Sequence, residues 1–258
     1  MNIEFLKNLL ELLLPGRCFV CGRELLHQER FLCTSCAMHM PLTYFWTERH
    51  NIMADKLNVR VQAIRDRGGV TEYEPYIQAA ALFFYRGDYK VLTQELKYNA
   101  EIPLGRYLAG VLGRKLSGSE AFGDVDVVMP VPLHWRRRYR RGYNQAEVIA
   151  VEVAKELGTA LDTTILYRKR YTRSQARLDV GQKSLNVEGA FSVRAERLGP
   201  YFAVAQNPSL RPVHILLIDD VCTTGSTLAE CCFARRRSIP PDSSIKISVA
   251  TLAFVGEL

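Results

Sequence analysis

Two adjacent acids and a run of hydroxyl side chains stand close together late in the chain. Asp219 and Asp220 follow an apolar run over residues 213–218, and residues 223–227 read Thr-Thr-Gly-Ser-Thr. Backbone N–H groups and the positive end of a helix attract anions, so this loop is suited to a phosphate. The acids would repel a phosphate and are better matched to sugar hydroxyls. These residue types predict a site for a ribose 5-phosphate, whose phosphate would contact Thr223, Thr224, Gly225, Ser226 and Thr227.

The elements around this loop are predicted from the apolar pattern. The run over residues 213–218 is nearly continuous, which is typical of a strand buried on both faces of a parallel sheet. Leu228, Cys231 and Cys232 follow at helical spacing, so the loop should open a helix. Ligands of α/β proteins bind at the carboxyl ends of parallel strands. The alternative is a strand, turn and helix in which the acids only cap the turn, but the unbroken pattern favours a site.

A second polar segment follows a second predicted strand. Residues 125–131 read as a buried strand, and five arginines fall within residues 136–141. Asn144 and Glu147 form a plausible capping pair for the next helix. The basic run is therefore predicted to be the loop between a strand and its helix, where it could clamp a pyrophosphate. A solvated surface or a nucleic-acid contact is the usual alternative for such a charge run.

Four of the seven cysteines form two Cys-x-x-Cys pairs near the N-terminus. They are Cys18, Cys21, Cys33 and Cys36, with eleven residues between the pairs. Four thiolates in this arrangement are typical of a closed, tetrahedral zinc site with a structural role. Disulfides and a redox motif are the alternatives. Two matched pairs suit one ion better than two redox centres, and a cytoplasmic location, which we expect, argues against disulfides.

The remaining pattern predicts an α/β fold with a mostly parallel sheet flanked by helices. Further strands are predicted at residues 79–85 and 245–254, and helices at 88–98 and 104–116. Residues 1–40 should form an N-terminal amphipathic helix and the zinc ribbon, residues 41–76 a connecting segment, and residues 77–258 the main domain. The chain of 258 residues carries a net charge of +7, which favours an anionic partner. No stretch reaches membrane-spanning length, so we expect no membrane insertion.

The acid-hydroxyl loop resembles the phosphoribosyl-pyrophosphate (PRPP) signature of the type I phosphoribosyltransferases. Together with Leu96-Lys97-Tyr98, Val131-Pro132-Leu133 and residues 141–145 (Arg-Gly-Tyr-Asn-Gln), and with the cysteine module, the chain resembles the ComF family. The resemblance implies that Asp219 and Asp220 hold the ribose hydroxyls and support catalysis, with Mg²⁺ accompanying PRPP. The residues expected at the pyrophosphate are Lys97, Val131, Pro132, Leu133, Arg138 and Arg141. A flap with Arg173, Gln175 and Lys183 is expected to cover the site, although Lys183 replaces the usual arginine.

The function expected from the resemblance is transfer of a phosphoribosyl group from PRPP to an unknown acceptor, in connection with DNA uptake or nucleotide metabolism. A non-catalytic alternative is open, in which PRPP regulates a protein that binds single-stranded DNA. Arginines interleaved with Trp135, Tyr139 and Tyr143 favour this alternative, because they offer phosphate contacts and stacking platforms. A third possibility is that the zinc module captures a protein of the competence machinery.

Overall fold

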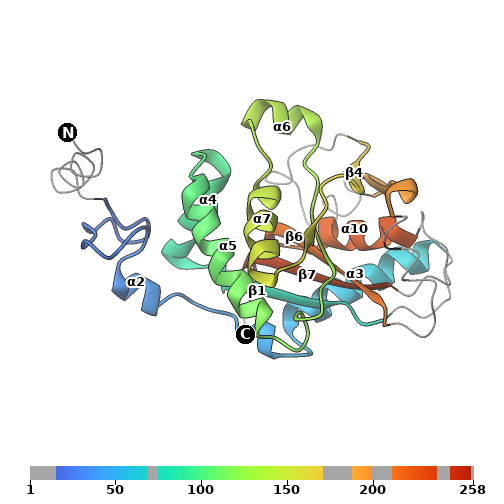
Figure 1. Ribbon diagram of the computed structural model, residues 1–258, viewed down its shortest axis with the longest axis horizontal. Coiled ribbons are helices and arrows are strands. Elements are labelled where there is room, and N and C mark those ends of the chain that lie inside the picture. Colours follow the sequence, from blue (N-terminus) through green and yellow to red (C-terminus); the bar gives the residue numbers. More distant parts are fainter. Residues whose placement is uncertain are drawn as a thin grey trace.

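The computed structural model describes residues 16–68, 75–170, 188–198, 201, 211–236 and 245–256. The predicted N-terminal helix and the three predicted flap residues, Arg173, Gln175 and Lys183, lie outside the described residues. Within them, no helix combines the length and the apolar character needed to cross a membrane. Figure 1 shows a central sheet between two layers of helices, with a small cysteine-rich part at one side.

The five-stranded sheet has the strand order β1-β7-β6-β2-β3, and every neighbouring pair is parallel. This confirms the predicted mostly parallel sheet. The central strands are apolar and almost entirely buried, because helices cover both of their faces. The strands are β1 (Gln78–Phe84), β2 (Val127–Pro130), β3 (Ala160–Leu161), β6 (Val213–Cys222) and β7 (Ile245–Phe254).

The direction of the crossovers places the helices. The connections from β1 to β2 and from β2 to β3 both run toward one edge of the sheet, whereas the β6–β7 connection runs the other way. Because such crossovers are right-handed, α5 (Ile102–Ser117) and α7 (Gln145–Leu157) cover one face, and α10 (Ser226–Arg236) covers the other. Helix α3 (Ile52–Arg67) packs beside α10, and α4 (Lys90–Tyr98) packs on α5 (Figure 1).

The segment before β1 is attached to the main core. The 3₁₀ helix η1 (Phe45–Thr47) buries Phe45, whose ring lies 5.6 Å from that of Phe84 and 5.8 Å from that of Phe254. Asn51 caps α3 by accepting from the N–H groups of Met53 and Ala54, and its amide nitrogen donates to the Ala79 carbonyl. Apolar packing and polar contacts therefore both hold this segment against β1 and β7.

The cysteine-rich part contains helix α2 (Thr34–Met38) and contacts the main body near α4 and α5. The hydroxyl of Tyr89 donates to the Cys36 carbonyl at 2.8 Å, and the rings of Phe31 and Tyr107 lie 5.4 Å apart. The remaining described elements are the ribbon of β4 (Leu166–Arg168) and β5 (Phe191–Val193), helix α6 (Trp135–Arg141), η2 (Gly87–Tyr89) and η4 (Ala195–Leu198).

Candidate functional site

A cavity of about 540 Å³ lies at the carboxyl edge of the sheet. The loops that follow β2 and β6 both contribute to its wall. These two strands are neighbours, and the chain leaves them in opposite directions across the sheet. Such a switch point leaves a crevice between the two outgoing loops, which is where open α/β sheets bind ligands. The predicted phosphate loop and the predicted pyrophosphate segment therefore meet in one cavity.

Both acids lie on β6, which runs further than the apolar pattern predicted. The strand continues to Cys222 because Asp219 pairs in register with Thr251 and Cys222 pairs with Phe254 of β7. Asp219 Oδ1 accepts the N–H of Asp220 at 2.9 Å, and Asp220 Oδ1 accepts the N–H of Val221 at 2.8 Å. The acids are thus held by strand backbone, and both line the cavity.

The two carboxyl groups differ in their electrostatic surroundings. Burial, together with the charge of Asp220, raises the pKa of Asp219 to about 7. Asp220 instead has the ammonium group of Lys97 3.4 Å from its Oδ2 atom. The Asp220 carboxylate in turn raises the pKa of Lys97, so this side chain stays charged. Only one of the two adjacent acids is therefore paired with a cation at this distance among the described residues.

Helix α4 brings Lys97 to the acids, and two contacts fix its position. The hydroxyl of Tyr143 donates to the carbonyl of Leu96, the residue before Lys97. Gly105 of α5 lets the helices approach closely, since a Cβ atom there would lie 2.6 Å from Leu96 Cδ1. The predicted site residue Lys97 thus reaches the cavity from a third element, between β1 and α5.

The hydroxyl loop, residues 223–227, joins β6 to α10 and is held by hydrogen bonds within the segment. Gly225 has a φ of 76°, a left-handed conformation that favours glycine. Thr224 Oγ1 and Ser226 Oγ lie 3.0 Å apart, and the Gly225 carbonyl accepts the N–H of Ala229 as α10 begins. Thr223, Thr224, Gly225 and Thr227 line the cavity, whereas Ser226 is buried and supports the loop. The helix N-terminus and the hydroxyls can bind an anion here.

The basic run was predicted to be a loop, and this prediction was wrong. Residues 135–141 form helix α6, because His134 Nδ1 accepts the N–H of Arg136 at the start and Gly142, with a φ of 84°, ends the helix. The connecting loop is the shorter stretch that contains Val131, Pro132 and Leu133, which lines the cavity.

The helical geometry divides the arginines of this run. Arg137, Arg140 and Arg141 line the cavity. Arg138 does not line it, and its guanidinium group lies 3.3 Å from Glu147 Oε2 on α7. The structure therefore brings Arg141 to the predicted pyrophosphate side and places Arg138 outside the cavity.

Asn144 is the predicted cap of α7, and it also shapes the pyrophosphate loop. Its side-chain oxygen accepts the N–H of Ala146, and its amide nitrogen donates to the Val131 carbonyl at 3.1 Å. One side chain thus starts the helix and holds the loop after β2. Glu147, the predicted partner in the capping pair, pairs instead with Arg138.

Sequence reasoning missed part of the cavity wall. Arg168 comes from β4, where burial lowers its pKa and its guanidinium group lies 4.9 Å from the Phe191 ring centre. In the sequence it stands out only as part of a basic segment. Other lining residues were not predicted as site residues, although they belong to segments that the sequence analysis singled out: Tyr98, Arg137, Arg140, Asn144, Gln145, Val221 and Cys222. The remaining ones carry no local signal for a site, and the tertiary fold brings them to the cavity: Tyr85, Thr93, Gln94 and Leu228.

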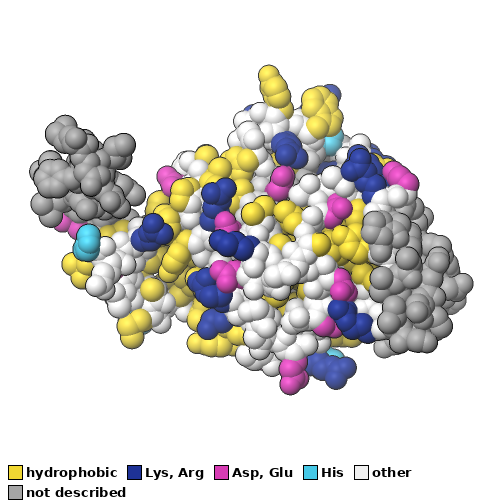
Figure 2. All heavy atoms as spheres, viewed as in Figure 1, with side chains coloured by type: hydrophobic (Ala, Val, Ile, Leu, Met, Phe, Trp, Pro, Cys, Tyr) yellow, Lys and Arg dark blue, Asp and Glu magenta, His cyan; other side chains and the backbone are white. Residues whose placement is uncertain are grey.

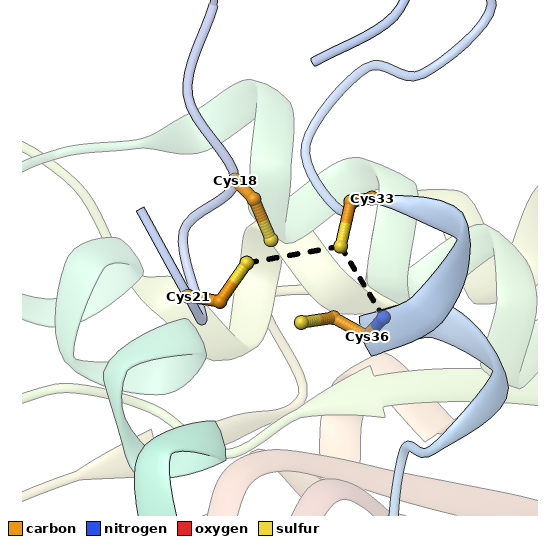
Figure 3. A group of neighbouring side chains, drawn as sticks. All are labelled: Cys18, Cys21, Cys33 and Cys36. Carbon is orange, nitrogen blue, oxygen red and sulfur yellow. Dashed lines mark hydrogen bonds between the residues drawn. The ribbon is translucent and has the colours of Figure 1, made fainter. Parts of the chain in front are cut away.

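The four N-terminal cysteines converge, as Figure 3 shows. All four Sγ atoms lie within 4.8 Å of one another, so the group could hold a metal ion. Cys33 Sγ accepts the N–H of Cys36 at 3.4 Å and lies 3.8 Å from Cys21 Sγ. Four thiols, two from the turn at residues 18–21 and two from the start of α2, match the donor set of a closed metal site. Cys222, Cys231 and Cys232 are buried in the main domain and take no part.

Comparison with known proteins gives relatives along most of the chain. DNA utilization protein YhgH of Salmonella typhi is 25% identical over 222 residues, which cover 85% of this chain and 90% of that protein. Competence protein F of Haemophilus influenzae is 31% identical over 144 residues, or 54% of this chain and 58% of that protein. No family model matches the chain. The chain thus has homologues with these two names, and the predicted ComF resemblance is confirmed.

Solved structures give weaker matches. The glutamine PRPP amidotransferase of B. subtilis aligns with 61% of this chain and 30% of its own, at 14% identity and a TM-score of 0.36. Orotate phosphoribosyltransferase from Aeropyrum pernix aligns with 74% of this chain and 77% of its own, at 13% identity and a TM-score of 0.29. The fold assignment therefore rests on the strand order and the parallel pairing described above.

Proposed function

We propose that the chain binds PRPP and transfers its phosphoribosyl group to an acceptor whose identity is unknown. One observation supports this most: a single cavity at the switch point unites two acids, a hydroxyl loop at a helix N-terminus, and several basic side chains. Each part matches one part of PRPP. The acids suit the ribose hydroxyls, the loop suits the 5-phosphate, and the basic groups suit the pyrophosphate.

In the proposed reaction, the bond between the anomeric carbon and the pyrophosphate oxygen breaks, and a bond from the acceptor forms at that carbon. Asp219 and Asp220 hold the ribose while positive charge develops on it. The loop after β2, with Lys97 and Arg141, stabilises the charge that gathers on the leaving pyrophosphate. The acceptor's proton passes to solvent or to a group of the acceptor, since no side chain is assigned as a general base.

Two metal ions belong to the proposal. Mg²⁺ is held by one or two carboxylates and by substrate phosphates in many phosphate sites, and the carboxylates of Asp219 and Asp220 fit that donor set. When bound, it would withdraw charge from the pyrophosphate. Zn²⁺ suits the four-thiolate group of Cys18, Cys21, Cys33 and Cys36, where it would tie together a segment with a small core.

A second candidate function is binding of single-stranded DNA, and the surface of α6 favours it. Trp135 and Tyr139 are 66% and 90% exposed, and arginines lie between them. In Figure 2, hydrophobic side chains project from the part of the molecule where Figure 1 places α6, with basic side chains nearby. Exposed aromatic rings can stack on bases while arginines contact phosphates. Relatives named for DNA utilization and competence agree with such a partner.

Isothermal titration with PRPP and Mg²⁺ tests the first proposal, and absence of binding would contradict it. Release of pyrophosphate from PRPP, measured with a series of bases, amines and nucleotides, then tests transfer and identifies the acceptor. For the second proposal, single-stranded DNA is titrated at several salt concentrations. Trp135→Ala/Tyr139→Ala should weaken DNA binding and leave PRPP affinity unchanged, because these rings do not line the cavity.

A further inference from the structure

The last turn of α4 has main-chain oxygens that the helix itself cannot satisfy. The final four carbonyls of an α-helix have no N–H partner one turn further along it. Here the Glu95 carbonyl accepts the N–H of Asn99, and Ala100 then turns the chain toward α5 with a left-handed φ of 58°. The Leu96 carbonyl belongs to the same turn, and it accepts the hydroxyl of Tyr143. A side chain from the corner between α6 and α7 therefore completes the end of α4.

The corner that carries Tyr143 is held on both sides. Gly142 ends α6 with a φ of 84°, and Asn144 starts α7 by accepting the N–H of Ala146. The Asn144 amide also donates to the Val131 carbonyl, which ties the corner to the loop after β2. Tyr143 itself does not line the cavity. Its hydroxyl therefore serves α4 from a fixed position and is not a contact for the ligand.

The Leu96 carbonyl shares a peptide group with the N–H of Lys97. Because the peptide group is planar, a hydrogen bond to the carbonyl also fixes the orientation of the bond that begins the next residue. The Leu96 side chain is completely buried and packs against Gly105, which holds the same residue from its other side. Lys97 extends a long, flexible side chain from this point to the cavity wall, where it is 36% exposed. The contacts of Leu96 thus determine where the Lys97 side chain starts.

We propose that Tyr143 is a positioning residue that holds Lys97 at the cavity wall, where Lys97 contacts the anionic end of PRPP. The inference rests on the proposed function for the identity of the ligand. The competing explanation is that the Tyr143 hydroxyl only stabilises the packing of α4 against the corner. A positioning role acts through Lys97 and disappears when the lysine is removed, whereas a packing role persists.

The test is a double-mutant cycle of Tyr143→Phe and Lys97→Met, with PRPP affinity measured by isothermal titration in the presence of Mg²⁺. Tyr143→Phe removes one oxygen atom and keeps the ring, so the variant should fold, which thermal unfolding checks. It should weaken PRPP binding by about three- to tenfold, the range for one hydrogen bond. Lys97→Met should weaken binding at least as much. In the Lys97→Met background, Tyr143→Phe should change the affinity by less than about twofold.

A second measurement needs no ligand. Acetylation of lysine side chains is followed by mass spectrometry in the wild type and in Tyr143→Phe at the same pH. Lys97 should react about twofold faster or more in the variant, because a hydrogen bond that restricts it is lost. Lys90 is exposed at the start of the same helix and should react at an unchanged rate. Equal acceleration of both lysines would mean that the whole helix has loosened, and it would overturn the inference.

The matched control is Tyr76→Phe, which removes a hydroxyl that donates to Asp55 Oδ1 at 2.7 Å and does not line the cavity. It should leave both the PRPP affinity and the Lys97 acetylation rate unchanged. Equal losses of affinity from Tyr143→Phe with and without Lys97 would overturn the inference and leave the proposed function standing, as would an unchanged affinity. No PRPP binding by the wild type would contradict the proposed function, and the acetylation rates would then decide whether Tyr143 holds Lys97.

Discussion

The two ends of β6 differ in how far their positive and negative groups balance one another. At the amino end, His214 Nδ1 lies 2.6 Å from Asp124 Oδ1, and Nε2 lies 2.7 Å from the Ser248 hydroxyl. The ammonium group of Lys246 lies 3.0 Å from the same Asp124 oxygen. At the carboxyl end, Asp219 and Asp220 face a cavity in which basic groups outnumber acids. Positive and negative groups are therefore paired at the amino end, whereas positive groups are in excess at the carboxyl end.

This difference distinguishes a structural polar network from a candidate ligand site. His214 is completely buried, and burial lowers its pKa to about 4, so it is neutral and needs one donor and one acceptor as partners. Asp124 and Ser248 supply them. Although a histidine between an acid and a serine suggests catalysis, the burial of His214 and Ser248 argues for a role in holding β6, β7 and the segment before β2 together. At the carboxyl end, the excess of basic groups faces the cavity, as expected for a site that binds an anionic ligand.

The largest expected effect comes from removing both acids at the carboxyl end. Asp219→Asn/Asp220→Asn should weaken PRPP binding by about a hundredfold or more, because two contacts to the ribose are lost. Thermal stability should fall little, since burial disfavours the charge of Asp219 in the folded chain. Isothermal titration and thermal unfolding measure the two effects. Retained PRPP affinity in the double variant would contradict the site assignment.

The opposite pattern is expected at the amino end. Asp124→Ala removes the partner of both His214 and Lys246 and should lower the free energy of unfolding by about 1–3 kcal/mol, as for other lost hydrogen bonds to charged groups. PRPP affinity should stay within about twofold. Urea unfolding followed by titration of PRPP into the folded variant checks both values. A large loss of affinity with unchanged stability would reverse our distinction between the two ends.

A smaller effect on PRPP affinity is expected for the arginines of α6, and it should differ between Arg141 and Arg138. Arg141→Ala should weaken PRPP binding by about tenfold, since it lines the cavity and loses a charged contact. Arg138→Ala, its matched control, should change affinity by less than about twofold because that side chain pairs with Glu147 outside the cavity. The two titrations are run at the same salt concentration. Equal losses would show that α6 acts as one diffuse basic surface.

The smallest expected effect is on the pH dependence of stability, where the two ends should oppose each other. The folded pKa of His214 is about 4, below its usual value of 6.5, so the unfolded chain binds the proton first and stability falls as pH decreases from 6.5 toward 4. The folded pKa of Asp219 is about 7, above 3.8, so its contribution falls as pH rises from 3.8 to 7.

Asp219→Asn should remove the second contribution and leave stability rising more steeply with pH between 4 and 7. We expect the variant to gain about 1 kcal/mol or more over the wild type at pH 7 relative to pH 4. Urea unfolding at a series of pH values measures this slope. An unchanged slope would mean that Asp219 titrates alike in the folded and unfolded chains.

Much of the site was predictable from the sequence because its chemistry is local. The acids and the hydroxyl loop at residues 219–227, and the four cysteines, are close enough in the chain for residue type and spacing to indicate what they can bind. The strands were predictable for a similar reason. A strand buried on both faces, such as residues 213–218, leaves a continuous apolar run that no exposed element would carry.

The tertiary structure decided what depends on neighbours distant in sequence. Helix α6 begins and ends at residues that flank it in the sequence, His134 and Gly142, but its packing against the rest of the fold decided that Arg141 lines the cavity and that Arg138 lies beside Glu147. The pairing of Lys97 with Asp220 joins residues that are more than a hundred positions apart. Sequence alone thus determined the chemical groups and the strands that carry them. Packing determined which charges meet, because the energy of a charge depends on burial and on partners that only the folded chain brings near.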